Sequence, residues 1–523
     1  MKHQKRTIME WVRLLCFGIT LLILLSLLKS GLAFGQLSVN FDQKLRDWDG
    51  FGINYVETCN LRDFDKYLET PQEYGGLSTL SEAKRKEILD LIFSSDGLRP
   101  GLVKMFLDPF HEREKGQYDH ETTTQWMRYF VHEGLKMTRA QGGDLQIITT
   151  MYGPPAWATK QRVIRGRDLD PAEKENVAMY MIHWAKYLIE NEGFPVKYIS
   201  LHNEGAQWIT WDDDGYSKWL HSDYNLWWPI PQIVDFLKFM PPMMAEHGLT
   251  DVGLTNGEFC IWENKADRPY MFPDVAKGIK DDALAHKNLG LISNHGFAHD
   301  LSWVSSRGSN MLRSGRSDLH AWTTSKTVDP PIWWNEAGSV ELIRSNIYDA
   351  KVNGLIPWAI IQSDPFSEVD PDLKPNWAGL NGENTAETEN SPNWVGTAIW
   401  VDRKGGFQVL PGYYKLKQVY CAGQPGMAVA NVQSDDSDIG LIAFAQNGTE
   451  NPDAIVVNNI GKSSRAISVN VTGTENLTWD GFMTHPDGAK FYEPIGKVSL
   501  VSGKLNYTIP PKSTITFFAT DTK

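Results

Sequence analysis

The sequence predicts an α/β fold, a (β/α)8 TIM barrel with a C-terminal β-sandwich domain that is joined by an N-terminal strand. Short apolar runs alternate with longer helical patterns as far as residue 410, and such alternation is typical of parallel strands with crossover helices. Beyond that point short strand patterns are separated by Gly, Asn, Asp and Pro, as in all-β domains. Leu37–Phe41 alternates apolar and polar residues ahead of the first run and is expected to add a strand to the sandwich.

Eight apolar runs are the expected strands of the barrel. Several are rich in Val and Ile, as in strands that are buried on both faces. In order, the runs are Phe51–Val56, Leu102–Leu107, Leu145–Met151, Val196–Leu201, Val252–Thr255, Leu291–Ser293, Pro331–Trp334 and Leu355–Ile361. An open doubly wound sheet is the alternative, but the chain lacks the Gly-rich phosphate loop that is typical of that fold.

The segment that follows the third run illustrates a crossover helix. Asp170 is a favourable N-cap, and Pro171 suits the first helical position. The apolar residues that then recur at helical spacing are Val177, Met181, Trp184 and Leu188. We expect this helix to end near Gly193, just before the fourth run.

The rest of the chain divides at changes of pattern. The expected strands of the sandwich are Ala428–Val432, Ile439–Ala445, Ala454–Asn458, Ala466–Val471, Lys490–Tyr492, Val498–Val501 and Thr514–Phe518. We therefore expect a targeting segment at 1–35, the joining strand at 36–47, the barrel at 48–410 and the sandwich at 411–523. The acidic, Pro-containing stretch 363–392 is expected to be a functional loop, because a loop of that length in a compact domain usually has a function.

Residues 1–35 have the layout of a secretory signal peptide. Basic residues precede the apolar stretch Leu14–Leu28, and Ala33 and Gly35 place small residues at the cleavage positions. The stretch is shorter than the roughly 20 residues of a membrane span. We expect a protein that is secreted, periplasmic or held at the cell surface, with no stable membrane partner once the signal is cleaved.

Charge and composition point to a carbohydrate partner. The net charge of −13 argues against binding to nucleic acid or to anionic membranes. The 20 tryptophans offer flat apolar faces that suit the C–H faces of sugar rings. Cys59, Cys260 and Cys421 are too widely spaced to indicate a zinc site or a disulfide framework. We expect a monomer that needs no metal and no organic cofactor.

The active site of a (β/α)8 barrel lies where the strands end at the C-terminal face. Polar and aromatic residues of kinds that bind or activate sugars follow most of the eight runs at that point. They are Asn54, Asp108, Tyr152, Trp157, Asn203, Glu204, His295, Glu336 and Trp358. Among them, Asn203 is expected to hold the sugar's 2-hydroxyl group, and His295 and Tyr152 are expected to hydrogen-bond the nucleophile and keep it ionised.

Glu204 and Glu336 are the candidate catalytic pair. Glycoside hydrolysis needs one carboxylic acid to protonate the leaving oxygen and one carboxylate on the opposite side of the sugar carbon. Asn-Glu occurs three times in the chain, but Glu192 ends a helical pattern, whereas the other two glutamates follow apolar runs. Their spacing fits the fourth and seventh barrel strands. Carboxyl groups about 5 Å apart would retain the sugar's configuration, and a gap of roughly 6.5–9.5 Å would invert it.

Several motifs resemble known carbohydrate-active enzymes. Leu201–Gly205 resembles the fourth-strand Asn-Glu motif of the retaining barrel enzymes called clan A, and Trp333–Ser339 resembles their seventh-strand nucleophile motif. Gly50–Gly52, Gly153–Trp157 and Pro411–Tyr414 are similar to glycoside hydrolase family 30. The resemblance covers nearly the whole chain after residue 35, and it implies the same barrel and β-sandwich.

By this resemblance Glu204 is the general acid/base of a retaining β-glycoside hydrolase and Glu336 is its nucleophile, with Trp157 and Trp358 lining the sugar subsite. Family members usually carry Asn-Glu-Pro on the fourth strand, whereas this chain has Gly205 after the glutamate. The substrate therefore stays open among plant or algal β-1,6-galactan or glucan, xylan, and β-glucosides or β-xylosides. The alternatives are a family 39-like or 79-like enzyme, a non-catalytic carbohydrate-binding protein on the same fold, and a lyase.

Further residues near these motifs are secondary candidates. Trp208, in a Trp-rich insertion after Glu204, and Trp334, in the seventh-strand motif, are expected to contact substrate. Glu258 follows the fifth run and is a reserve carboxylate. The arginines that would suit an acidic or sulfated sugar if they faced the cleft are Arg162, Arg165 and Arg167.

Overall fold

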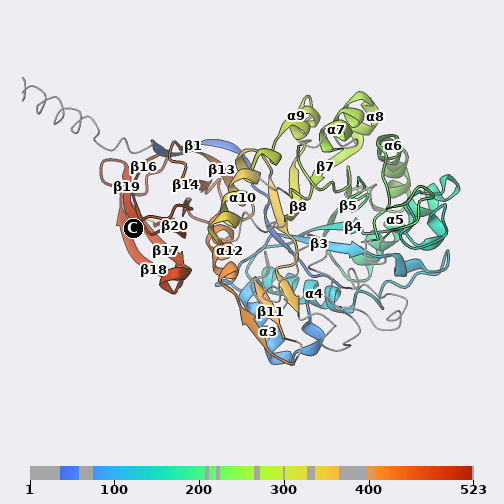
Figure 1. Ribbon diagram of the computed structural model, residues 1–523, viewed down its shortest axis with the longest axis horizontal. Helices are drawn as coiled ribbons and strands as arrows, with labels where there is room; N and C mark the ends of the chain where they lie inside the picture. The colour runs from blue at the N-terminus through green and yellow to red at the C-terminus, as the bar shows by residue number, and fades with distance from the viewer. Residues whose placement is uncertain are drawn as a thin grey trace, which may run out of the picture.

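The computed structural model describes residues 36–57, 73, 75–206, 211–218, 224–263, 271–297, 301–326, 336–363, 398–402 and 404–520. A barrel surrounded by helices lies beside a domain of β-strands (Figure 1). The expected signal peptide, nearly all of the acidic loop, Trp208 and Trp334 fall outside the described residues. Among the helices that are described, none is long and apolar enough to cross a membrane.

Eight parallel strands form the closed barrel, which confirms the predicted fold class. They are β2 (Gly50–Asn54), β3 (Leu102–Leu107), β4 (Gln146–Met151), β5 (Val196–Ser200), β6 (Gly253–Thr255), β7 (Leu289–Asn294), β8 (Ala321–Lys326) and β9 (Gly354–Pro357). The last strand pairs with the first through Phe51 and Leu355, so the sheet has no free edge. Seven of the eight predicted runs overlap one of these strands.

The prediction of the seventh barrel strand is wrong. The strand lies at Ala321–Lys326, about ten residues before the expected run Pro331–Trp334, which falls outside the described residues. It pairs with β7 and β9. Its buried residues include Thr323 and Thr324, whose hydroxyl groups bond to Asn346 and to the carbonyl of Asn294. Hydrogen bonds of buried polar side chains, rather than a continuous apolar run, therefore hold this strand in the barrel.

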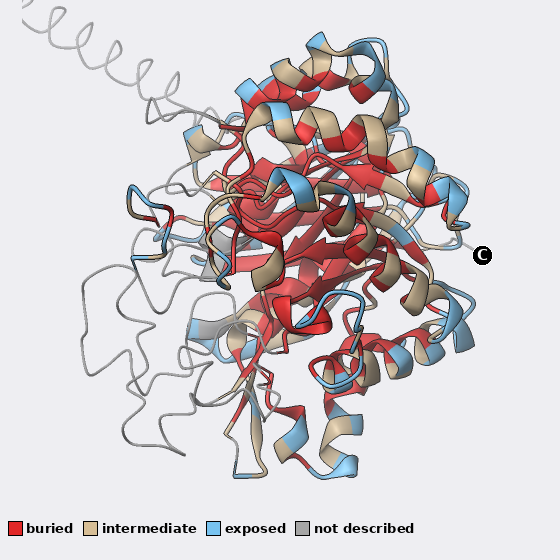
Figure 2. Cartoon of the chain, turned by 90° about the vertical axis from the view of Figure 1, so that its right-hand side faces the viewer, coloured by how far each residue is buried: buried red, intermediate tan, exposed pale blue. Residues whose placement is uncertain are grey.

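Helices cover the outside of the barrel. In chain order they are α3 (Glu82–Phe93), α4 (Gln125–Ala140), α5 (Lys174–Glu190), α6 (Ile230–Glu246), α7 (Phe272–Asp281), α8 (Ala283–Asn288), α9 (Arg307–Arg313) and α10 (Glu336–Tyr348). The predicted crossover helix is present, because Asp170 caps a short 3-10 turn that leads directly into α5. The buried strands and exposed outer faces of the helices are visible in Figure 2.

The barrel interior changes character from one end to the other. Side chains two residues apart on a strand share a face, so Leu102, Lys104 and Phe106 of β3 occupy successive layers. Leu102 belongs to an apolar cluster at the N-terminal end, with Ile148, Leu291, Trp322 and Ile356. The next layer is polar and includes Lys104 and Thr150, both fully buried. Phe106 then lies toward the C-terminal face, where its ring contacts Trp358.

The C-terminal domain is one continuous sheet of nine strands in the order β18-β17-β20-β15-β14-β13-β1-β16-β19. Its strands are β1 (Leu37–Asp47), β13 (Ala428–Ser434), β14 (Ile439–Ala445), β15 (Ala454–Asn459), β16 (Arg465–Thr472), β17 (Thr478–His485), β18 (Lys490–Ser499), β19 (Lys504–Ile509) and β20 (Ser513–Thr520). Phe41 and Trp479 lie on strands far apart in this order, yet their rings stack at 5.8 Å. The sheet therefore folds over on itself as a sandwich around its own apolar core.

The joining strand is confirmed: β1 lies between β13, to which it is antiparallel, and β16, to which it is parallel. In Figure 1 this strand, drawn in blue, lies among the red strands of the C-terminal domain. The sequence did not predict β17, β19 or a small sheet formed by β10 (Ile361–Ser363), β11 (Ile399–Val401) and β12 (Phe407–Val409).

Helices α10 and α12 (Pro411–Ala422) connect the barrel to the sandwich. Arg46 of β1 donates to the carbonyl oxygens of Ile347, in α10, and Val352. Tyr348 accepts a hydrogen bond from the backbone N–H of Ala443 and donates to the carbonyl of Ala430, both in the sandwich. The sandwich thereby holds the C-terminal end of the helix that begins at Glu336.

Candidate active site

Glu204 lies just beyond β5, the fourth barrel strand, and its side chain is buried. Its backbone has φ of 44°, in the left-handed region that costs a non-glycine residue about 1–2 kcal/mol. Two hydrogen bonds fix this turn, since the N–H of Glu204 donates to the carbonyl of Glu258 at 2.7 Å and the N–H of Glu258 donates to the carbonyl of His202 at 2.8 Å. Strain that is held in this way at a barrel strand end is typical of a functional position.

Among the described residues, two side chains contact the carboxylate of Glu204. Nδ1 of His295 lies 3.1 Å from its Oε1, and Nδ2 of Asn225 lies 3.5 Å from its Oε2. Asn225 also accepts a hydrogen bond from Asn203 at 2.8 Å. The structure thus brings together Asn203, Glu204 and His295, which the sequence predicted, and adds Asn225, which it did not.

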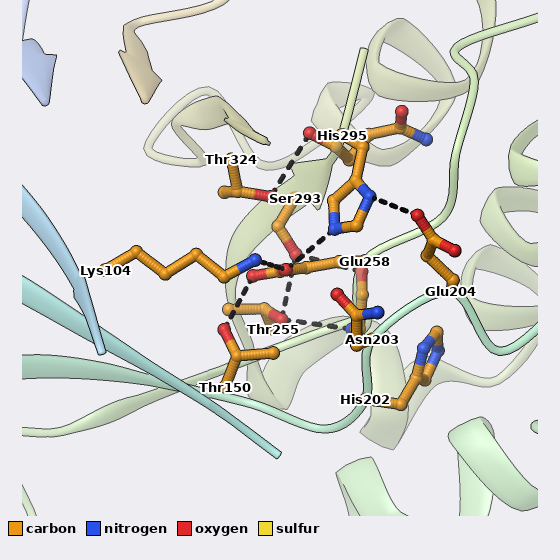
Figure 3. A network of polar contacts seen from close by, with 12 residues as sticks. Lys104, Thr150, His202, Asn203, Glu204, Thr255, Glu258, Ser293, His295 and Thr324 are labelled. Atoms are coloured by element: carbon orange, nitrogen blue, oxygen red, sulfur yellow. Dashed lines mark hydrogen bonds and ion pairs between the residues drawn. The ribbon is translucent and has the colours of Figure 1, made fainter. Parts of the chain in front are cut away.

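A second carboxylate, Glu258, lies on the opposite side of the His295 ring from Glu204 and is fully buried (Figure 3). It forms an ion pair with Lys104, accepts a hydrogen bond from Thr150 at 2.8 Å, and lies 3.0 Å from Nε2 of His295. Burial alone would raise the pKa of Glu258, but the charge of Lys104 and the contact with His295 lower it to about 2. A carboxylate that is enclosed and paired in this way has no access to a sugar carbon, so Glu258 is not the nucleophile.

His295 does not have the partner that the sequence suggested. It was expected to hydrogen-bond the nucleophile, but its two ring nitrogens face Glu204 and Glu258. His295 therefore belongs to the predicted acid/base.

The glycine after the acid/base has a structural cause. The N–H of Gly205 donates to Nδ1 of the buried His202 at 3.1 Å, a bond that proline could not make because it has no N–H. A Cβ atom at this position would also lie 2.7 Å from Cβ of Trp228 and 2.8 Å from the ring of His202. Burial lowers the pKa of His202 to about 3, so its ring is neutral and can accept this bond. The departure from Asn-Glu-Pro is thus built into the packing around His202.

Aromatic residues of the predicted subsite lie at the same end of the barrel. Tyr152 and Trp358 both contact the ring of Phe106, and Trp358 is half-buried. Trp157 is also half-buried, and its indole N–H donates to the carbonyl of Glu112 at 2.8 Å. Trp157 and Trp358 keep some exposed surface, whereas Tyr152 is almost fully buried.

Two further predicted substrate contacts are internal. Asn54 is buried and donates to the carbonyl of Pro357 at 3.1 Å. Asp108 is buried and accepts the N–H of Phe110 at 2.8 Å, which caps a 3-10 turn. Both residues support the strand ends around the site from behind.

A chain of neutral histidines adjoins Asp108. Nε2 of His111 lies 3.7 Å from Oδ2 of Asp108, and its Nδ1 lies 2.9 Å from Nδ1 of His120. His120 continues the chain through Nε2, which lies 2.8 Å from Nδ1 of His183 in α5. Burial lowers the pKa of His111 to about 3 and that of His120 to about 2. These rings therefore brace the β3 and α5 segments without charge.

The side chain of Glu336 lies outside what the structure describes, although its backbone begins α10. The helix follows β8, the seventh barrel strand, after the residues 327–335 that are not described. The carboxyl separation of about 5 Å that retention requires stays a prediction.

Most of the secondary candidates contact other residues of the chain. Trp211 and Trp228, from the Trp-rich insertion, are buried and pack internally rather than forming an open wall. Arg162 pairs with Asp170, Arg167 with Asp168 at 3.0 Å, and Arg165 lies over the ring of Tyr224. Two of the three arginines are thus engaged by acids of the chain itself. Among the described residues, no cluster of His, Cys, Asp and Glu has a metal-binding arrangement.

Comparison with known proteins identifies the architecture. No protein-family profile matches the sequence, and no curated protein matches it significantly. Solved structures do match. A GH30 endoxylanase from Clostridium papyrosolvens C71 has 15% identity and a TM-score of 0.63, with 93% of this chain and 100% of that chain covered. The catalytic domain of GH30 xylanase C from Talaromyces cellulolyticus has 15% identity and a TM-score of 0.65, with the same coverage.

An endo-β1,6-glucanase also matches, at 15% identity and a TM-score of 0.64, with 94% of each chain covered. At these identities the likeness establishes the fold, which includes both the barrel and the sandwich. The chain therefore shares the fold of the GH30 structures that its motifs resemble.

Proposed function

We propose that the protein is a secreted β-glycoside hydrolase that retains configuration by double displacement. The observation that carries the proposal is the position of Glu204, a buried carboxylate on a strained turn at the end of the fourth barrel strand, between His295 and Asn225. Glu336 follows the seventh strand, at the start of α10. Two carboxylates at these places in a barrel match the needs of glycoside hydrolysis.

The roles follow from the chemistry of the reaction. Glu336 attacks the anomeric carbon while Glu204 protonates the departing oxygen, and Glu204 then removes a proton from the water that releases the sugar. Asn203, which is linked to Glu204 through Asn225, is the proposed partner of a hydroxyl group of the same sugar. The half-buried rings of Trp157 and Trp358 supply stacking surfaces.

The proposed substrate is a plant or algal β-linked glycan, with xylan and β-1,6-linked glucan or galactan as the first polymers to test. The matched structures include xylanases and an endo-β1,6-glucanase, which supports this choice. Purified protein would be incubated with a polysaccharide panel, and products would be followed by reducing ends and by size. Proton NMR of the first product gives the anomeric configuration, and a β product supports retention.

Three variants test the residues. Glu204→Gln and Glu336→Gln are expected to lose at least about 100-fold in kcat/KM, in line with the usual value of a positioned acid, base or nucleophile. Glu192→Gln is the matched control, because Glu192 belongs to another Asn-Glu pair and, within the part of the chain that the structure describes, bonds to Arg128, His132 and Tyr187 on the barrel's outer helices. Near-full activity in either site variant refutes the assignment, and binding without cleavage by the unmodified protein favours a non-catalytic carbohydrate-binding protein.

A further inference from the structure

Four charged or ionisable side chains form one continuous chain through the barrel centre. They are Lys104 from β3, Glu258 after β6, His295 after β7 and Glu204 after β5. In Figure 3 the imidazole of His295 lies between the two carboxylates, and Lys104 reaches Glu258 from the far side. Lys104 and Glu258 have no exposed side-chain area, and His295 has 2%.

Glu258 can only accept hydrogen bonds, and its surroundings keep it ionised. Its donors are Lys104, Thr150 at 2.8 Å and His295 at 3.0 Å. Burial opposes the charge, but Lys104 and His295 prevail and lower the pKa of Glu258 to about 2. Because the carboxylate carries no proton at working pH, Nε2 of His295 must carry the proton of their shared hydrogen bond.

The proton on Nε2 determines what the other ring nitrogen of His295, Nδ1, presents to Glu204. When His295 is neutral, its single proton is on Nε2, so Nδ1 presents a bare lone pair to Oε1 of Glu204, 3.1 Å away. Two acceptor atoms that both lack a proton cannot form a hydrogen bond at this distance. A proton must therefore lie between them, either on the carboxyl group of Glu204 or on Nδ1 of a doubly protonated His295.

Among the described residues, His202 also interacts electrostatically with His295, but burial lowers the pKa of His202 to about 3, so this ring is neutral. Phe297 covers one side of the His295 ring at 5.0 Å. The proton is thus stored on the Glu204–His295 pair itself.

We propose that Glu258 is a positioning residue that locks His295 in the tautomer with its proton on Nε2, and thereby secures on the Glu204–His295 pair the proton that the acid step uses. The proposal rests on the proposed role of Glu204. In the acid step, a carboxylate oxygen of Glu336 bonds to the anomeric carbon as the bond from that carbon to the leaving oxygen breaks; the electron pair of the broken bond stays on the leaving oxygen, which takes the proton of the pair. In the second step, the oxygen of water bonds to the anomeric carbon as the bond to Glu336 breaks and its electron pair returns to the carboxylate, and the water gives one proton to the Glu204–His295 pair.

Glu258→Gln tests the lock, because an amide can turn its NH2 group toward Nε2 while its oxygen faces Lys104. His295 is then expected to accept at Nε2 and carry its proton on Nδ1, where it donates to an ionised Glu204. Nitrogen-15 NMR of labelled histidine distinguishes the two states, since protonated and bare ring nitrogens have well-separated shifts. A protonated Nε2 in the unmodified protein that becomes bare in the variant supports the lock, and a bare Nε2 in the unmodified protein overturns it.

The catalytic consequence has a separate measurement. Aryl glycosides of the sugar found in the polysaccharide screen would be compared over a range of leaving groups. The variant should lose about 100-fold in kcat/KM with poor leaving groups, which need the acid, and less than about 10-fold with dinitrophenyl-type groups, which do not. Equal losses across the series overturn the catalytic part of the proposal.

Controls separate the possible failures. Thr150→Val removes another donor to Glu258 but leaves the carboxylate, so the histidine tautomer and the leaving-group dependence should not change. If Glu258→Gln does not fold, Lys104→Met/Glu258→Gln removes both charges and takes its place. If the unmodified protein cleaves no glycoside, the proposed function fails, whereas the NMR measurement still decides the lock.

Discussion

Replacing Lys104 by Met would isolate the buried charge at the barrel centre. Methionine has similar length and no charge, so the change leaves Glu258 buried without its cation. Thr150 and His295 still face the carboxylate. We expect a clear loss of stability with little change in the shape of the barrel.

The size of this loss follows from the burial of the pair. Removing one partner of a buried ion pair costs roughly 3–5 kcal/mol, and the two remaining donors favour the lower end. Burial raises the pKa of Glu258, whereas Lys104 and His295 together lower it to about 2, so the cation is one of the groups that keep the carboxylate ionised. We therefore expect a loss of about 3 kcal/mol.

Urea unfolding at pH 7, followed by tryptophan fluorescence, measures the effect. Because the pKa of Glu258 is depressed, its contribution is complete above pH 4.5 and is lost as the pH falls toward 2; Lys104→Met should weaken that dependence. Lys104→Met/Glu258→Gln buries no charge and should recover most of the stability. If the double variant is as unstable as the single one, the cost does not come from the stranded carboxylate and the reasoning is wrong.

Three further perturbations address other parts of the fold. His111 and His120 stay neutral because burial lowers the pKa of these side chains to about 3 and about 2. Folding stability therefore falls as the pH drops below 6.5. His120→Asn should make the urea midpoint less dependent on pH below 6.5. Burial raises the pKa of Glu57 to about 8, so stability falls as the pH rises from 4.5 to 8, and Glu57→Gln should remove that decline. Arg46→Met should lower the free energy of unfolding by about 3 kcal/mol through two lost hydrogen bonds to a charged donor, and Arg46→Lys should recover only part of it.

Each of these has an outcome that contradicts it. If the urea midpoint of His120→Asn depends on pH below 6.5 as strongly as that of the unmodified protein, the histidine chain is protonated in the folded state. A persistent decline above pH 4.5 in Glu57→Gln would assign that decline to other groups. Full recovery of stability by Arg46→Lys would show that charge alone, rather than the fork of the guanidinium, holds the end of α10.

Sequence reasoning succeeded where hydrophobicity reports burial. The run Leu102–Leu107 matches β3 residue for residue, because a strand that is buried on both faces is a continuous apolar run. It failed at β8, whose buried threonines bond to Asn346 and Asn294 and therefore look like a loop. Strand β17 was missed for a related reason, since its eight residues include Asp480 and Gly481.

The site was predicted in part. Glu204, Asn203 and His295 follow apolar runs and were found by position. Lys104 also had a signal that was not used, because a lysine in an otherwise apolar run implies a buried acid to pair with it. Asn225 belongs to an insertion whose course cannot be predicted from a local sequence pattern. Its contact with Glu204 is therefore visible only in the structure.

Strand β1 has a consequence for the order in which the protein assembles. Leu37 pairs with Ser434 and Val469, so the first strand to leave the ribosome waits about 400 residues for its neighbours. Pairing between such distant segments is slow compared with local contacts, and the barrel strands, each paired with a nearer neighbour, can close first. Until residues 428–472 arrive, β1 has two unpaired edges that another chain could occupy. The protein is therefore most prone to aggregate after the barrel has closed and before the sandwich is complete.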